Sequence, residues 1–85
     1  MKYQLFLTNA FLKKYEKSPQ KIQIRVKEKL RILKDSPFAG KKLTGELTGE
    51  FSYRVGDYRI IYTIEKDEIF AEAIGHRKDI YRKSR

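Results

Sequence analysis

Two arginines, Arg54 and Arg59, lie on either side of a Gly56-Asp57 dipeptide, in a stretch rich in aromatic and β-branched residues. Glycine can supply the positive φ of a tight turn, so the segments Phe51–Val55 and Tyr58–Ile64 are predicted to form a β-hairpin. Pairing counted outward from a two-residue turn places Arg54 directly opposite Arg59, where like charges cost about 0.2–1 kcal/mol. Such a pair either points into solvent or binds an anion.

More cationic side chains follow the third strand that is expected after this hairpin. That strand begins after a second turn at Lys66-Asp67 and leads into Gly75-His76-Arg77-Lys78, near the same edge of the sheet. Lys41 and Lys42 lie in a glycine-containing loop before the hairpin, and each is either an anion contact or an ordinary surface lysine. Because guanidinium groups stay charged and bind oxyanions bidentately, we predict an anion-binding site on this face.

The composition agrees with an anionic partner. The 85 residues include 20 Lys and Arg against 11 Asp and Glu, which gives a formal net charge of +9 and a pI near 9.9. This balance is typical of proteins that bind nucleic acid, and it also suits an acidic protein partner.

The length of the chain, residues 1–85, allows a single domain with one modest core. No cysteine is present, so disulfides and thiolate metal sites are excluded, in agreement with a reducing cytoplasm. No apolar run is long enough to span a membrane, and the N-terminus does not have the pattern of a signal peptide. We therefore expect a cytoplasmic protein that does not bind membranes.

Three elements before the hairpin are predicted to position it. Lys2–Leu7 reads as a buried strand, and Asn9 as the N-cap of a short helix over Ala10–Lys17. Ser18-Pro19 is the usual opening of a helix, and Asp35-Ser36-Pro37 ends it. This second helix has a basic outer side and an apolar stripe at helical spacing. The stripe consists of Ile22, Val26, Leu30 and Leu33.

This order of elements predicts an α+β fold. A strand, two helices and a three-strand meander would form an antiparallel sheet with both helices packed on one face. The hairpin register places Tyr53 opposite Ile60, with their alternate neighbours, on the covered face. The Arg54–Arg59 pair then lies on the opposite face, which the helices leave open. The tail after Gly75 is expected to be one helical turn or irregular.

With this order of elements, the segments YRVGDYRIIYTI and GHRKDIY make the chain resemble the RelE/ParE superfamily of bacterial and archaeal toxins. The resemblance covers nearly the whole chain, and it includes the small size and the high basicity. It implies one of two activities. RelE-like members cut messenger RNA in the ribosomal decoding site and are held inactive by a co-expressed antitoxin, whereas ParE-like members poison DNA gyrase. Because both activities occur on one fold, the residues of the open face must decide between them.

The resemblance also implies roles for three residues. Arg59 matches the arginine after the hairpin turn, Arg77 the arginine after the last strand, and Tyr81 the closing aromatic. RelE-type enzymes that are strong nucleases often have lysines where this chain has Glu50 and Ser52. We expect a ribosome-dependent endoribonuclease, and the alternatives are a ParE-like gyrase inhibitor or a catalytically weak RNA-binding member of the family.

Metal-independent cleavage of RNA needs attack by the 2′-hydroxyl, stabilisation of the phosphorane charge and protonation of the leaving 5′-oxygen. The arginines Arg59 and Arg77 are the expected phosphate clamp. Tyr81 and His76 are the candidates for proton transfer, although strand alternation can point His76 away from the clamp. The expected RNA-binding residues are Arg54, Lys41, Lys42 and Lys78. Three glutamates are either bases or surface ion-pair partners, namely Glu46, Glu50 and Glu72.

No metal or other cofactor is expected. No set of His, Cys and carboxylate residues has the spacing of metal ligands, and no glycine-rich phosphate loop precedes a helix. The expected partners are messenger RNA on the ribosome and an acidic antitoxin. The antitoxin would neutralise the arginines and cover apolar surface around the second helix.

Overall fold

The computed structural model describes residues 3–43 and 49–83, with side chains described as far as Ile80. Within these ranges no helix is long and apolar enough to cross a membrane. In chain order the elements are β1 (Gln4–Leu7), α1 (Asn9–Lys17), α2 (Gln20–Asp35), the 3-10 helix η1 (Pro37–Ala39), β2 (Lys41–Lys42), β3 (Glu50–Val55), β4 (Tyr58–Glu65), β5 (Glu68–His76) and α3 (Arg77–Lys83).

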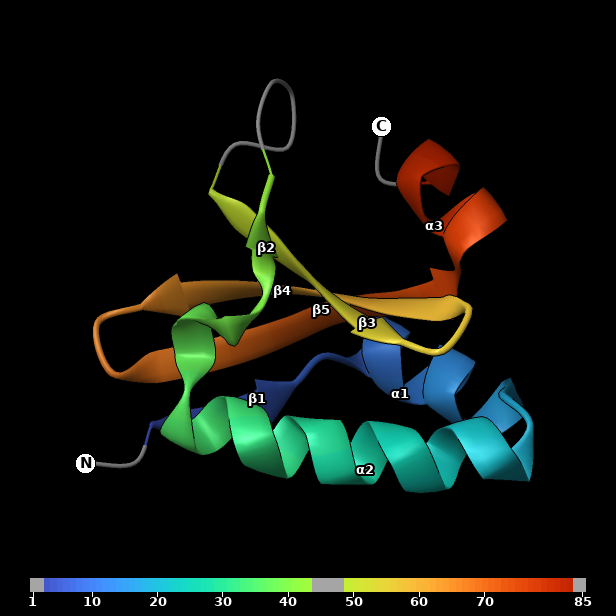
Figure 1. The fold of residues 1–85 in the computed structure, drawn as a ribbon, viewed down its shortest axis with the longest axis horizontal. Helices are drawn as coiled ribbons and strands as arrows, with labels where there is room; N and C mark the ends of the chain where they lie inside the picture. Colours follow the sequence, from blue (N-terminus) through green and yellow to red (C-terminus); the bar gives the residue numbers. More distant parts are fainter. Residues whose placement is uncertain (1–2, 44–48, 84–85) are drawn as a thin grey trace.

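The strands form one sheet in the order β1-β5-β4-β3-β2 (Figure 1). The α+β class and the sequence of a strand, two helices and a three-strand meander are confirmed. The expectation of a purely antiparallel sheet is wrong for one pair, because β1 runs parallel to β5. The chain between β1 and β5 includes both helices and the strands β2–β4, so it is long enough for the crossover that parallel pairing requires, whereas a hairpin is not.

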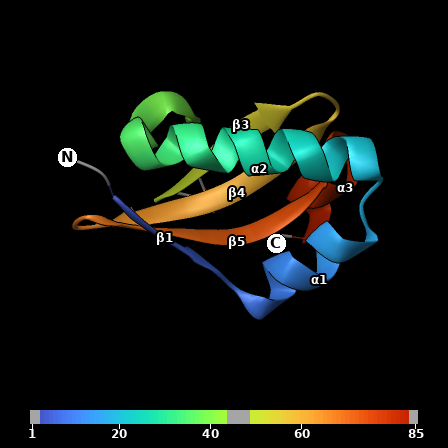
Figure 2. The same ribbon diagram turned by 90° about the horizontal axis from the view of Figure 1, so that it is seen from below.

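Helix α2 lies across one face of the sheet, and α1 lies beside β5, beyond the end of β1 (Figures 1 and 2). Val26 and Leu33 of α2 are fully buried in one core with Ile60 and Tyr62 of β4. Phe11 of α1 is fully buried in the same core. Each such side chain contributes about 1.5–3 kcal/mol through its burial. The two helices therefore share one core against the sheet, with α2 lying across it and α1 beside β5.

The predicted register of the hairpin is confirmed. Tyr53 pairs with Ile60 and Arg54 pairs with Arg59, and Gly56 in the connecting turn has φ +61°. The second turn also falls where it was predicted, with Lys66 at φ +57°. Because neighbouring residues alternate between faces, the strands present a second set of side chains on the face opposite α2. We call this the open face; its residues include Lys41, Ser52, Arg54, Arg59, Ile61 and Ala73.

The first strand was predicted to be buried, and that prediction is wrong. Within the described part of the chain, β1 is an edge strand that pairs only with β5, and Phe6 and Leu7 are 43% and 37% exposed. Phe6 stacks on Phe70 at 5.3 Å between ring centroids. A short apolar run has the same sequence pattern in a central strand and in an edge strand, so the pattern alone does not give the burial.

Both helix starts differ from the prediction by one residue. Thr8, rather than Asn9, caps α1, because the Thr8 hydroxyl accepts a hydrogen bond from a backbone N–H of the first turn. Helix α2 begins at Gln20, and Ser18 caps the end of α1 instead of the start of α2. The predicted loop after α2 contains η1 and the short strand β2, and the C-terminal tail forms α3.

A buried tyrosine positions the chain between α2 and β2. The Tyr62 hydroxyl donates to the Pro37 carbonyl at 2.7 Å and accepts from the Gly40 N–H at 3.0 Å. Burial raises the pKa of Tyr62 above its usual value, and the hydrogen bond from Gly40 partly opposes this shift. These contacts fix η1 against the sheet, and β2 follows directly with Lys41.

Candidate functional site

The two opposed arginines share one hydrogen-bond acceptor. Arg54 Nε donates to the Gly56 carbonyl at 3.4 Å, and an Arg59 guanidinium nitrogen donates to the same carbonyl at 3.3 Å. Arg59 also donates to the Tyr58 carbonyl at 3.0 Å. A shared acceptor holds both guanidiniums at the hairpin turn and offsets part of their repulsion. Arg54 is exposed and Arg59 is half-buried, so an incoming anion can reach both.

The third predicted arginine begins α3 next to the same turn. The Arg77 backbone N–H donates to the Asp57 carbonyl at 2.8 Å, and the Arg77 side chain is exposed. Lys78, the next residue, is exposed as well. The structure thus brings Arg77 to the Gly56-Asp57 turn, around which the open-face arginines also lie.

The glycine at position 75 allows α3 to pack closely against the sheet. Gly75 pairs with Arg59, and a Cβ at Gly75 would lie 3.2 Å from Ile80 Cδ1. The absence of this Cβ lets α3 pack closely on β5, with Ile80 buried. Tyr81 follows Ile80 within α3, and its side chain lies outside the described residues, as does the whole of Glu46.

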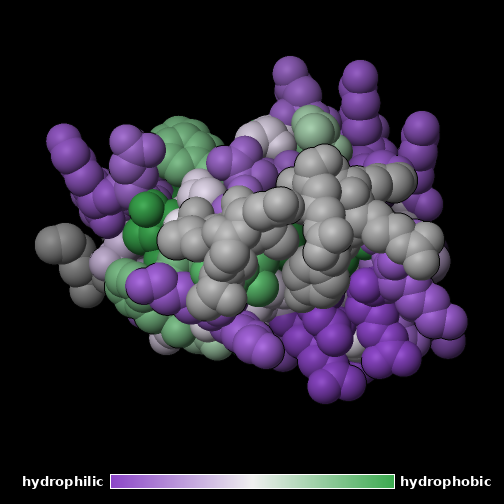
Figure 3. All heavy atoms as spheres, turned by 90° about the horizontal axis from the view of Figure 1, so that it is seen from above, coloured by the Kyte–Doolittle hydropathy of each residue, from purple (hydrophilic) through white to green (hydrophobic). Residues whose placement is uncertain are grey.

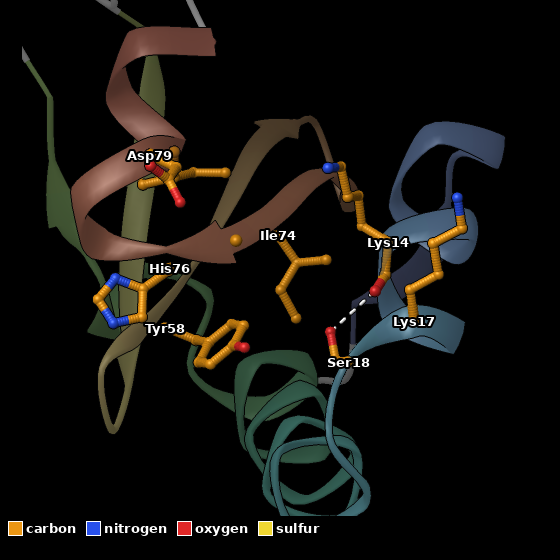
Figure 4. Close-up of a pocket in the computed structure, with 9 residues that line it drawn as sticks. Lys14, Lys17, Ser18, Tyr58, Ile74, His76 and Asp79 are labelled. Carbon is orange, nitrogen blue, oxygen red and sulfur yellow. Dashed lines mark hydrogen bonds between the residues drawn. The ribbon is translucent and has the colours of Figure 1, made fainter.

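His76 faces away from the arginines. It pairs with Tyr58, which alternates with Arg59 along β4, and the two rings contact edge to face at 5.7 Å. His76 Nδ1 accepts the Lys78 N–H at 3.2 Å, which caps the start of α3. Figure 4 shows His76 and Tyr58 at a pocket of about 220 Å³. The structure therefore does not bring His76 together with the predicted phosphate clamp.

The side chains of Lys41 and Lys42, which form β2, lie on opposite faces of the sheet. Lys41 pairs with Ser52 and shares the open face with the arginines, whereas Lys42 pairs with Phe51 on the other face. Both side chains are exposed. Of these two predicted RNA-binding lysines, the structure therefore places only Lys41 on the face of the arginine pair.

A groove of about 450 Å³ occupies the open face between α1 and α3. Ile61, Ala73 and Ile80 supply apolar surface, and Glu50 and Glu72 line it as well. Figure 3, seen from this side, shows hydrophobic atoms near the centre, with hydrophilic side chains around them. Helix α1 contributes Lys13, Lys14 and Lys17 to the lining.

These α1 lysines were not predicted as site residues. Two of them, Lys13 and Lys17, are four residues apart and lie together on the side of α1 away from Phe11, which was a signal in the sequence. This side of α1 lines the groove because α1 lies beside β5. That position depends on tertiary packing, so the sequence alone did not predict it.

At the two strand positions where related nucleases often have lysines, this chain has Glu50 and Ser52. Ser52 is buried, and Glu50 is half-buried at the start of β3. Within residues 3–43 and 49–83, no group of three or more His, Cys, Asp and Glu residues could hold a metal ion. The described site therefore offers guanidiniums, ammonium groups and carboxylates as its reactive groups.

A family model described as "ParE toxin of type II toxin-antitoxin system, parDE" matches residues 5–81. Toxin RelG of Mycobacterium tuberculosis is 44% identical over 46 residues, which are 52% of this chain and 53% of RelG. The match thus spans about half the length of that curated relative.

Two solved structures resemble the whole domain and also carry sequence similarity. The toxin–antitoxin complex RelBE2 of Mycobacterium tuberculosis matches with a TM-score of 0.84 and 31% identity, covering 91% of this chain and 100% of that chain. The RelB–RelE complex of Methanococcus jannaschii matches with a TM-score of 0.76 and 26% identity, covering 92% and 96%. Because the family model spans most of the sequence, this chain belongs to the ParE toxin family of type II toxin–antitoxin systems, within the RelE/ParE superfamily that its motifs resemble.

Proposed function

We propose that this toxin is a ribosome-dependent endoribonuclease that cleaves messenger RNA without a metal. The observation that carries the proposal is the arginine pair on the open face, which is accessible and lies beside the start of α3. Guanidinium groups bind the non-bridging oxygens of phosphate and stay charged at all relevant pH values. The similarity to toxins named RelE supports RNA as the substrate.

In the proposed reaction the 2′-oxygen of one nucleotide attacks the adjacent phosphorus, and the bond to the 5′-oxygen of the next nucleotide breaks. The products are a 2′,3′-cyclic phosphate and a 5′-hydroxyl. Arg59 and Arg77 would stabilise the added negative charge of the phosphorane, with Arg54 and Lys41 holding neighbouring phosphates. Tyr81 is our first candidate for proton transfer, because His76 faces Tyr58 on the other side of the sheet.

Substitution of the clamp tests this assignment. Arg59→Ala and Arg77→Ala should each lower cleavage about 10²–10³-fold, as expected when one transition-state contact is lost. Lys42→Ala is the matched control, because it removes a cation from the opposite face of the sheet. Circular dichroism should show that all three variants are folded. Full growth arrest by a folded Arg77→Ala toxin would remove Arg77 from the mechanism.

A ParE-like gyrase inhibitor is the second candidate, and Glu50 and Ser52 favour it because they replace lysines of strong nucleases. One induction experiment separates the two functions. Translation arrest with messenger RNA cut within codons would support the nuclease. Double-strand DNA breaks with intact messenger RNA would instead support gyrase as the target.

We further propose that the toxin is restrained by an acidic antitoxin. The net charge of +9 and the exposed arginines favour a negatively charged partner. Exposed apolar side chains on and after α2 would anchor it, since Ile24 is 61% exposed and Phe38 is 66% exposed. The related toxins were solved in complexes with antitoxins named RelB, which supports this proposal.

A further inference from the structure

The groove on the open face contains a carboxylate oxygen without a partner. Glu50 Oε1 is buried and has no hydrogen-bond partner among the residues that the structure describes. The residue directly opposite, Thr63, donates its hydroxyl hydrogen to Glu72 Oε2 at 3.2 Å instead. A buried acceptor without a donor is costly, so a ligand that reaches the carboxylate and supplies N–H groups would gain affinity by pairing with it.

The remainder of the groove suits a flat, largely apolar ring. Ile61, Ala73 and Ile80 line it with aliphatic groups, of which Ile61 and Ile80 are almost fully buried, and its volume of about 450 Å³ falls within the range of about 300–1,000 Å³ found for small-molecule sites. Unstacked bases of single-stranded RNA are recognised through such surfaces and through hydrogen bonds to their edges. The α1 residues Lys13 and Lys17 add positive charge beside the groove, which favours an anionic chain.

We propose that this groove holds one base of the RNA substrate and that the Glu50 carboxylate selects guanine; this inference rests on the proposed RNA-cleaving function. Guanine presents two adjacent donors, N1–H and N2–H, which match the two oxygens of a carboxylate. Adenine and cytosine present one amino group on the corresponding edge, and uracil presents one imide N–H. Bidentate pairing makes Glu50 a specificity-determining residue at a strand position where related nucleases often carry lysine.

Glu50 lies apart from the arginine pair along β3. Glu50 and Arg54 are four residues apart on β3, so their Cα atoms are about 13 Å apart at about 3.3 Å per residue. The Arg54 and Arg59 guanidiniums are bound at Gly56, on the side away from Glu50. An attacking 2′-oxygen must lie within about 3–3.5 Å of the phosphorus, whereas the edge of a base lies beyond the ribose. With a phosphate at the turn, the position of Glu50 suits contact with the edge of a neighbouring base.

The test uses binding of RNA that cannot be cleaved, so it does not depend on catalysis. Five-nucleotide 2′-O-methyl oligouridines would carry guanine, inosine or uracil at the central position, with affinities measured at low salt. The wild-type protein should bind the guanine oligonucleotide about tenfold more tightly than the uracil one. Inosine, which lacks the N2 amino group, should be intermediate. Glu50→Gln should reduce these differences to less than about twofold, because its amide retains one acceptor oxygen and adds a donor.

Glu65→Gln is the charge-matched control, because Glu65 is exposed at the far turn between β4 and β5. It should keep the preference for guanine. Glu50→Gln should also be at least as stable as the wild type, since the buried oxygen Oε1 has no hydrogen bond to lose. Equal wild-type affinity for all three oligonucleotides, or no binding, would overturn the base-selecting role, even if the toxin cleaves messenger RNA. Unchanged discrimination by Glu50→Gln together with weaker binding of an antitoxin would identify the groove as a protein-binding surface. Guanine preference in a protein that does not cleave RNA would support the base site and refute the nuclease proposal.

Discussion

Replacement of Tyr62 by phenylalanine should destabilise the toxin strongly, although it removes one atom. The Tyr62 hydroxyl bonds two backbone groups, the Pro37 carbonyl at 2.7 Å and the Gly40 N–H at 3.0 Å. Tyr62 and Pro37 are buried, so the carbonyl loses its partner away from water, whereas Gly40 is half-buried. A buried polar group left unpaired costs about 1–3 kcal/mol. Counting the carbonyl in full and the amide at the lower limit gives a loss of about 2–4 kcal/mol.

Urea unfolding followed by circular dichroism measures this loss. In a domain of this length, 1 kcal/mol shifts Tm by about 4–8 °C, so a loss of 2 kcal/mol corresponds to about 8–16 °C. Tyr53→Phe is the matched control, because Tyr53 belongs to the same core margin and its hydroxyl has no described hydrogen bond. A loss below about 0.5 kcal/mol in Tyr62→Phe, equal to that in the control, would refute the reasoning that this hydroxyl anchors η1 and β2.

Three further predictions concern pH, α3 and the antitoxin. Because the pKa of Tyr62 is raised by folding, its stabilising contribution is complete below about pH 10 and decreases at higher pH, so urea unfolding should show the difference between wild type and Tyr62→Phe shrinking there. Gly75→Ala should place a methyl group 3.2 Å from Ile80 Cδ1 and increase amide hydrogen exchange in α3, unlike Gly49→Ala, where no atom lies within 4 Å and only backbone strain is expected. The association rate of the toxin with its antitoxin should fall as salt rises, and a rate independent of salt would contradict an acidic partner.

The sequence predicted the hairpin well because its pairing is local. A two-residue turn at Gly56-Asp57 leaves one register for the flanking segments, and a shift by one residue would turn the whole apolar set to the other face. The opposition of Arg54 and Arg59 follows from that register without any tertiary information. The resemblance of the motifs then identified the family, which the family match confirms.

Features that depend on packing between distant segments could not be predicted in the same way. The parallel pairing of β1 with β5 joins residues more than 60 positions apart, for instance Phe6 with Phe70. The apolar residues of β1 gave no sign that one edge of the strand would remain free. Helix α1 directly follows β1, so its position depends on this pairing. The contribution of Lys13 and Lys17 to the groove depends on it as well. The side on which His76 lies depends on β5 keeping its register with β4 beyond a bulge near Ile61.

The shared acceptor explains how the chain can retain two opposed arginines and still bind an anion. In the isolated toxin the guanidiniums of Arg54 and Arg59 donate to the neutral Gly56 carbonyl, at 3.4 and 3.3 Å. A phosphate offers charged oxygens, and hydrogen bonds between ionised groups are shorter and about twice as strong as neutral ones. Binding of phosphate should therefore draw both side chains from the turn, and it should remove the like-charge repulsion at the same time. Arg77 is tied by its backbone to Asp57 in that turn, so its side chain is free to join the same phosphate without moving α3.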